Sequence, residues 1–212
     1  MTTSRLPFDA VLCDLDGVIR HYDSAPLHRL ERAVGVAEGT TARIAFSSDV
    51  DRPALLGQIS TAQWVENIAL RLVGHPLPPT RARELAAAFE AAPFRADEEV
   101  VAMLRRVRGR VPLVLVTNAT SALDGDLARL GLADLADHIV SSARVGVAKP
   151  DRRIYDLAAE RAGAAAERCL FVDDRPENVR AATALGMTGL HYRTPADLRT
   201  ALGPLLAEGA PA

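Results

Sequence analysis

The chain has 212 residues, of which 49% are hydrophobic, and its formal net charge is −2. This length and apolar content predict one domain with a sizeable core, or a core with a small inserted unit. The balance of acidic and basic side chains argues against a nucleic-acid-binding surface. No apolar run approaches the roughly 20 residues that span a bilayer. The first residues also lack a secretory signal pattern, so we expect a cytoplasmic protein without a membrane partner.

Short apolar runs that alternate with helical patterns predict a Rossmann-like α/β fold, a parallel sheet with helices on both faces. The expected strands are 8–13, 111–116, 138–142, 169–172 and 188–192. The expected helices are 98–108, 123–130, 151–162 and 176–185. Two cysteines, Cys13 and Cys169, lie in apolar segments and are typical of buried thiols in a reducing compartment. We assign residues 1–19 and 95–212 to this core.

The segment 20–94 interrupts the alternation, because it contains helical patterns and no convincing buried strand. Ser60 and Gln63 have the spacing of a capping box and predict a helix over 62–72. Trp64 shares a face of that helix with apolar residues and is expected in a cap core. Further patterns predict helices over 27–34 and 81–91 and a loop over 74–79. We therefore expect a small helical cap inserted into the core.

Seven functional side chains stand at the ends of the predicted strands or in the loops that follow them. They are Asp14, Asp16, Thr117, Asn118, Lys149, Asp173 and Asp174. Because ligands bind beyond the carboxyl ends of parallel strands, we expect these groups to converge on one edge of the sheet. Clustered carboxylates repel one another without a cation, and a set of oxygen ligands without sulfur suits Mg²⁺. With a hydroxyl and an ammonium beside the metal, the set predicts phosphoryl transfer.

Lys149 is the only lysine among the 25 basic side chains, and it precedes a proline. A compact ammonium can reach several oxygens at once, whereas the planar fork of arginine needs a different geometry and more room. We therefore expect Lys149 to have a functional role that arginine cannot take over.

Four short sequences, DLDGV (14–18), VTN (116–118), AKPD (148–151) and FVDD (171–174), resemble in this order the four motifs of the haloacid dehalogenase superfamily of hydrolases. The resemblance covers about residues 8–192. It implies a Mg²⁺-dependent phosphatase that acts on a small phosphate monoester, such as a sugar phosphate, through an aspartyl-phosphate intermediate.

The resemblance implies roles for the four carboxylates. Asp14 would be the nucleophile and a metal ligand. Asp16 would be the general acid and base and would lend its backbone carbonyl to the metal. Asp174 would bind Mg²⁺ directly, and Asp173 directly or through water. The acid at Asp16 argues against dehalogenation, because the haloalkanoate dehalogenases of the superfamily resemble one another in lacking it.

The resemblance also implies which residues bind the substrate. Thr117 and the backbone of Asn118 would hold the phosphoryl group, and Lys149 would join the nucleophile to the phosphoryl oxygens. Arg20 and His21 follow the first motif and could face the substrate beneath the cap. A solvated hinge is the other interpretation of this pair.

The turn at 57–60, the Trp-containing helix after it and the sequence DDRPEN (173–178) are similar to a narrower group. That group includes bacterial sugar-phosphate phosphatases and the N-terminal phosphatase domain of soluble epoxide hydrolase. Asn178 could hydrogen-bond the motif loops. Two alternatives stay open: a phosphotransferase or phosphomutase on the same core, and a non-catalytic protein that binds a phosphorylated metabolite or a partner. The chain could be a monomer or a homodimer.

Overall fold

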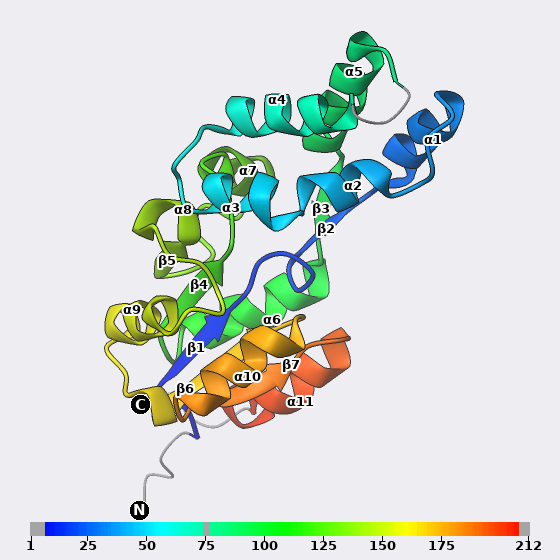
Figure 1. The fold of residues 1–212 in the computed structure, drawn as a ribbon. Coiled ribbons are helices and arrows are strands. Elements are labelled where there is room, and N and C mark those ends of the chain that lie inside the picture. The colour runs from blue at the N-terminus through cyan, green and yellow to red at the C-terminus, as the bar shows by residue number, and fades with distance from the viewer. Residues whose placement is uncertain (1–6, 74–76, 208–212) are drawn as a thin grey trace, which may run out of the picture.

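The computed structural model describes residues 7–73 and 77–207. The core is a five-stranded sheet in the order β5-β4-β1-β6-β7, in which all neighbours are parallel (Figure 1). The strands are β1 (Ala10–Cys13), β4 (Leu113–Thr117), β5 (His138–Ser141), β6 (Cys169–Asp173) and β7 (Thr188–His191). The five predicted strands are therefore confirmed, each within two residues at either end.

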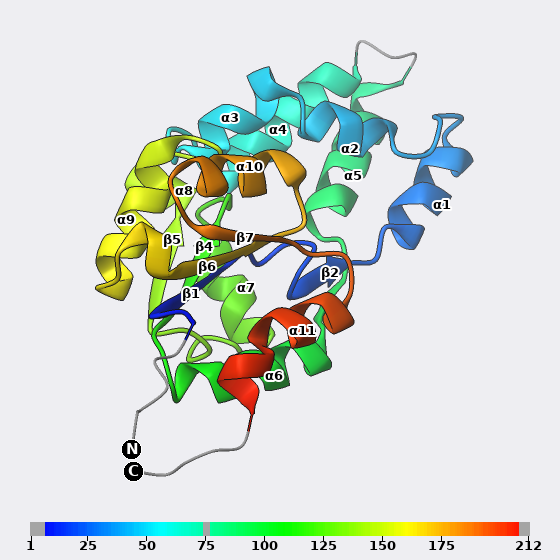
Figure 2. The ribbon, with the colours of Figure 1, turned by 90° about the horizontal axis from the view of Figure 1, so that it is seen from below.

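Helices cover both faces of the sheet (Figure 2). One face carries α9 (Arg152–Ala162) and α10 (Pro176–Ala184), and the other carries α6 (Glu98–Arg108), α7 (Leu123–Arg129) and α11 (Pro195–Leu206). Successive side chains of a strand point to opposite faces. Ala10 and Leu12 accordingly pack in the first layer, and Val11 and Cys13 in the second. This layering confirms the predicted α/β fold class.

Five helices of the described chain form a cap above the carboxyl ends of the strands (Figure 1). They are α1 (Ala25–Ala33), α2 (Thr40–Ala45), α3 (Ser48–Leu55), α4 (Thr61–Leu72) and α5 (Pro79–Glu90). Their apolar side chains form a separate core that contains Leu27, Trp64, Ile68 and Leu85. The prediction that Trp64 packs inside the cap is therefore confirmed.

The predicted capping box opens α4. The Ser60 hydroxyl accepts a hydrogen bond from the Gln63 backbone N–H at 3.2 Å, and the Gln63 side chain accepts one from the Ser60 N–H at 2.8 Å. The predicted helix over 62–72 is therefore confirmed. Of the loop predicted over 74–79, residues 74–76 lie outside the described residues.

Several elements were not predicted, α2 among them. Its first turn contains Thr40 and Thr41, which are weak helix formers. The carboxylate of Glu31, which is fully buried on α1, accepts hydrogen bonds from the backbone N–H groups of Gly39 and Thr41, each at 2.7 Å. A side chain from another helix therefore accepts hydrogen bonds from two backbone N–H groups at the start of α2, which have no partner within the helix. The local sequence of α2 does not indicate this contact.

A two-stranded antiparallel ribbon, β2 (Arg20–Tyr22) and β3 (Phe94–Ala96), joins the cap to the core. This ribbon was not predicted, because the expected strands are buried ones and Arg20 is the only buried residue among the six of the ribbon. Each strand has three residues, and the whole cap separates the two in the sequence. The other elements without a prediction are α3, α11, the short α8 (Ser142–Val145) and a 3₁₀ turn at Ala166–Arg168.

Cys13 and Cys169 are buried and free, as the apolar segments around them predicted. Burial raises the pKa of both thiols, and the pKa of Cys169 reaches about 11. Both side chains therefore stay protonated and act as small apolar groups. No described helix has the length and apolar content that a membrane crossing requires.

Gly57, which follows α3, lies where the cap approaches the core closely. Its φ angle is +68°, and a Cβ atom built on it would lie 2.2 Å from the carbonyl oxygen of Ala143 in α8. Gly35 has a similar φ angle of +77°, but a Cβ atom there meets nothing within 4 Å. An alanine substitution at Gly35 therefore measures the cost of the backbone conformation alone, and one at Gly57 measures that cost together with a steric clash.

We expect Gly57→Ala to lower the free energy of unfolding more than Gly35→Ala does. Both variants place alanine in the left-handed region, which costs about 1–2 kcal/mol. Only Gly57→Ala also forces the cap away from α8. Urea denaturation of the two variants measures the difference, and equal losses would contradict close packing at this junction.

Candidate active site

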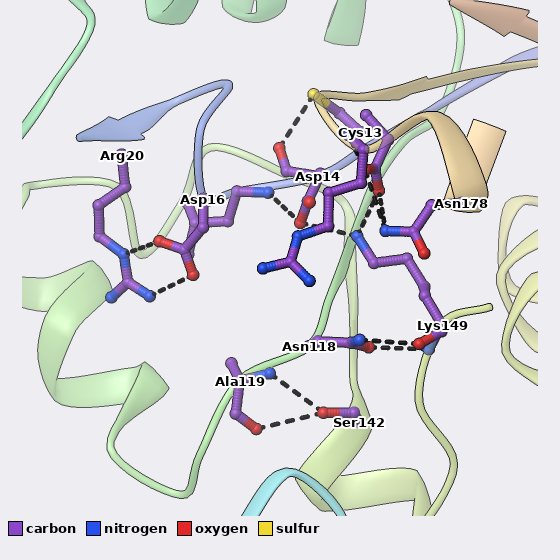
Figure 3. A network of polar contacts seen from close by, with 12 residues as sticks. Cys13, Asp14, Asp16, Arg20, Asn118, Ala119, Ser142, Lys149 and Asn178 are labelled. Atoms are coloured by element: carbon purple, nitrogen blue, oxygen red, sulfur yellow. Dashed lines mark hydrogen bonds and ion pairs between the residues drawn. The ribbon is translucent and has the colours of Figure 1, made fainter. Parts of the chain in front are cut away.

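Most of the predicted site residues come together beyond the carboxyl ends of β1, β4 and β6, and Figure 3 shows Asp14, Asp16 and Lys149 among them. β4 lies on one side of β1 and β6 on the other, so a topological switch point falls here, where open sheets bind ligands. A cavity of about 370 Å³ occupies this place and has walls from both the core and the cap. The motif residues on its walls are Asp14, Asp16, Asn118, Lys149 and Asp174.

Lys149 joins two carboxylates from neighbouring strands. Its Nζ atom lies 2.8 Å from Asp14 Oδ1 and 2.7 Å from Asp173 Oδ2, and all three side chains are buried. Burial alone would lower the pKa of Lys149, but the charges and hydrogen bonds of the two carboxylates outweigh it and raise that pKa. The ammonium is therefore charged and neutralises part of the acidic cluster.

Asn118 fixes the loop that carries Lys149. The Asn118 side chain donates to the Lys149 carbonyl at 2.9 Å and accepts from the Lys149 backbone N–H at 2.8 Å (Figure 3). The next residue, Ala119, donates its backbone N–H to the hydroxyl of Ser142 at 3.0 Å. Sequence reasoning missed Ser142, because a serine after a short strand carries no distinctive signal.

Asp173 is fully buried, and its hydrogen bonds fix its orientation. Besides Lys149, it accepts from the backbone N–H of Arg175 at 2.8 Å and from the side chain of Asn178 at 3.0 and 3.1 Å. The predicted contact of Asn178 with the motif loops is therefore confirmed. These donors hold the carboxylate that in turn orients Lys149.

One oxygen each from Asp14, Asp173 and Asp174 lies within 4.8 Å of the others. Gly17 allows this approach, because a Cβ atom on it would stand 2.3 Å from Asp174 Oδ2. Three carboxylates without a sulfur or imidazole ligand form a donor set that Mg²⁺ prefers. The residues present therefore fit the predicted metal.

Burial raises the pKa of Asp14 to about 8, although the charge of Lys149 acts in the opposite direction. Its Oδ1 atom accepts from the Leu15 backbone N–H at 2.7 Å. A divalent cation next to the carboxylate would favour its ionised form.

Thr117 ends β4, is fully buried and is not among the described residues that line the cavity, although the next residue, Asn118, is. Its hydroxyl has no hydrogen-bond partner among the described residues. A buried polar group without a partner costs about 1–3 kcal/mol, so a bound oxygen atom would stabilise this position. The hydroxyl is therefore consistent with the predicted phosphoryl contact.

Asp16 and Arg20 form a bidentate ion pair. Arg20 donates to both carboxylate oxygens of Asp16, at 2.6 and 2.8 Å (Figure 3), and to Asp126 Oδ2 at 2.7 Å. Asp16 is 37% exposed and Arg20 only 4%. A solvated hinge is therefore the wrong interpretation of Arg20, which is a buried side chain that orients Asp16.

Arg20 and His21 lie in different places. Arg20 is on the wall of the cavity, whereas His21, the next residue of β2, is absent from the described residues that line it. Side chains alternate across a strand, so the two point to opposite faces of the ribbon. The prediction that His21 binds substrate has no support from this position. Arg175, by contrast, lies at the cavity.

The sequence profile of the haloacid dehalogenase-like hydrolases matches residues 8–186. The chain is similar to the sesquiterpene phosphatase astK of Aspergillus oryzae, with 36% identity over 51% of this chain and 57% of that protein. It is similar to a phosphoserine phosphatase of Thermus thermophilus, with 37% identity over 51% of this chain and 46% of that protein. A (S)-2-haloacid dehalogenase of a Pseudomonas species shows 31% identity over 50% of this chain and 46% of that protein. The chain thus matches about half the length of each relative.

The fold is similar to that of a HAD family enzyme from Bacteroides thetaiotaomicron, whose structure is a complex with magnesium and inorganic phosphate. The TM-score is 0.68 at 18% identity, and the match covers 88% of this chain and 94% of that one. This likeness concerns the fold. The profile match confirms the resemblance that the four motifs predicted.

We expect Lys149→Met to destabilise the protein by about 3–5 kcal/mol in metal-free buffer, because it leaves two buried carboxylates without their partner. Lys149→Arg keeps the charge and serves as the control, with a smaller loss. Thermal and urea denaturation measure both variants. A Lys149→Met protein as stable as the wild type would show that the bridge has no role in stability.

Proposed function

Because the chain belongs to the haloacid dehalogenase-like hydrolase family, we propose that it is a Mg²⁺-dependent phosphatase that hydrolyses a small phosphate monoester through an aspartyl-phosphate. The observation that carries the proposal is the buried carboxylate of Asp14, held by Lys149 at the wall of the cavity. The acids Asp173 and Asp174 stand beside it. The names of two phosphatase relatives support the same reaction.

The first step transfers the phosphoryl group to the enzyme. A carboxylate oxygen of Asp14 forms a bond to phosphorus, and the bond between phosphorus and the ester oxygen breaks. Asp16 donates a proton to the leaving alcohol. Lys149, the Thr117 hydroxyl and the Asn118 backbone hold the phosphoryl oxygens in place.

The second step releases inorganic phosphate. Water attacks phosphorus, Asp16 accepts the proton of that water, and the bond to Asp14 breaks. Asp14, Asp173 and Asp174 would hold Mg²⁺, which supplies charge stabilisation for the phosphoryl oxygens when bound.

The ion pair with Arg20 suits the second of these steps. Both oxygens of Asp16 accept hydrogen bonds from Arg20, and an acceptor carboxylate is what the general base of the second step requires. The first step needs a protonated Asp16 that turns toward the ester oxygen, so the bidentate contact opens in that step. Arg20 is therefore a positioning residue for the acid and base.

Asp16 also distinguishes a phosphatase from a dehalogenase. The leaving group of a phosphate monoester is an alkoxide, which needs a proton, whereas a halide leaves without one. An acid on the cavity wall two residues after the nucleophile therefore favours ester hydrolysis over the activity named for the Pseudomonas relative.

We expect Asp14→Asn to lower the release of phosphate from monoesters by roughly 10³-fold or more, because the amide is not a nucleophile. Activity of the wild type should disappear with a chelator and return with Mg²⁺. A colorimetric phosphate assay over a panel of esters measures both effects. Asp156→Asn, the same change on an exposed part of α9, is the matched control and should keep full activity.

Two outcomes would contradict the proposal. Full activity in Asp14→Asn would exclude this carboxylate as the nucleophile. A folded wild type that binds Mg²⁺ yet releases no phosphate from any ester would favour a binding protein, or a transferase if added alcohols accept the group.

A further inference from the structure

The cavity concentrates the aromatic side chains of the chain. The sequence contains one Trp, three Tyr and five Phe. Five of these nine line the cavity: Tyr22, Phe46, Trp64, Phe89 and Phe94. In a chain with only 4% aromatic residues, this gathering at one cavity is a property of the site rather than of the composition.

The aromatic rings form two connected groups. On the cap, Phe89 meets Phe46 and Trp64 edge to face, with ring centroids 5.4 and 5.7 Å apart. On the ribbon, Tyr22 and Phe94 meet in the same way at 5.6 Å. Edge-to-face contacts of this kind hold rings in fixed positions. The cavity therefore has a preformed apolar wall opposite the phosphoryl site.

Part of this apolar wall is open to water. Phe46 is 58% exposed and Tyr22 is 48% exposed, and both belong to the few large exposed hydrophobic side chains in the described chain. Leu27 and Leu55 extend the same apolar wall on the cap. Exposed apolar side chains that line a cavity are typical of a ligand site.

The cap helices offer few polar partners to a ligand. The polar groups that they place at the cavity are His28, Asp51, Thr61, Glu90 and the indole N–H of Trp64, which has no hydrogen-bond partner among the described residues. Thr61 contacts the Thr120 hydroxyl at 3.4 Å, and His28 lies 3.5 Å from the Glu38 carboxylate. Asp51 and Glu90 can accept hydrogen bonds, and the Trp64 indole can donate one. The aromatic and aliphatic side chains of the same helices offer no partner to a sugar hydroxyl, so burying one against them is unfavourable.

We propose that the substrate is a phosphate monoester whose organic part is an apolar hydrocarbon group, rather than a sugar. This inference rests on the proposed phosphatase function and names the substrate class of the same site. The phosphate lies at Asp14 and Lys149, and the hydrocarbon lies against the aromatic wall of the cap. A cavity of about 370 Å³ falls in the range that holds sizeable organic ligands, roughly 300–1,000 Å³.

The test compares ethyl, butyl, hexyl and octyl phosphate with glucose 6-phosphate and fructose 1-phosphate. All are esters of primary alcohols and differ little in chemical reactivity, so kcat/KM reports contacts with the organic group. Each buried methylene is worth about fourfold in affinity. We expect kcat/KM to rise by at least about 10²-fold from ethyl to octyl phosphate, with the sugar phosphates no better than ethyl phosphate.

Two variants assign the effect to the apolar wall. Phe46→Ala removes an exposed ring at the cavity and should lower the ratio of octyl to ethyl phosphate by about tenfold. Leu70→Ala is the matched control, because Leu70 is 59% exposed on α4 and is not among the described residues that line the cavity. We expect it to leave the ratio unchanged. Both positions are exposed, so neither change should prevent folding.

If kcat/KM did not change from ethyl to octyl phosphate, or were higher for the sugar phosphates, the inference would be overturned and the phosphatase proposal would stay intact. Failure to hydrolyse any ester, ethyl phosphate included, would overturn the phosphatase proposal and the inference with it. An unchanged ratio in Phe46→Ala would show that alkyl chains bind away from the aromatic wall.

Discussion

The site depends on one buried ammonium between two buried carboxylates. β1 and β6 are adjacent, so Asp14 and Asp173 meet at their ends, where two like charges would repel in a medium of low dielectric constant. Lys149 lies between them at hydrogen-bond distance from both, and Asn118 at the end of β4 holds its backbone. A single ion-pair network thus joins the end of β6, the end of β1 and the loop before α9. Asp14 is therefore oriented before any ligand arrives, and the proposed reaction would need little reorganisation of this carboxylate.

A second charged residue connects this chemistry to the cap. Arg20 begins the ribbon, binds Asp16 on the core side and reaches Asp126 on α7. Its guanidinium also lies 5.0 Å from the ring centroid of Tyr22 and 5.4 Å from that of Phe94. The side chain that holds Asp16, the proposed acid and base, is thus also packed against the aromatic wall. A movement of the ribbon would reach Asp16 through this contact, so in the proposed mechanism the fit of the organic group would be coupled to proton transfer.

The core was predictable because its signals are local. Apolar runs such as CLFV end in acids, and their alternation with helical patterns fixes a parallel sheet, so the edge where Asp14, Lys149 and Asp173 meet follows from topology. The ribbon and α2 were not predictable, because each depends on a distant contact, such as that between Glu31 and the backbone of Thr41. For Trp64 the helical face was predicted correctly. Its second role at the cavity was not, because that cavity exists only once several cap helices and the ribbon are packed together.

In the proposed reaction, the core supplies the chemistry and the cap selects the organic group. The core side chains proposed to meet the phosphoryl group belong to one charged network, in which Lys149 contacts two carboxylates at once. A substitution in this charged network therefore disturbs several contacts at once. The cap wall is built instead from apolar side chains, among them rings that meet edge to face, such as Phe46 and Phe89. Each dispersion contact is individually weak, so a single change in the wall is expected to shift the preferred organic group by a small increment, whereas changes at two rings in contact would not be additive.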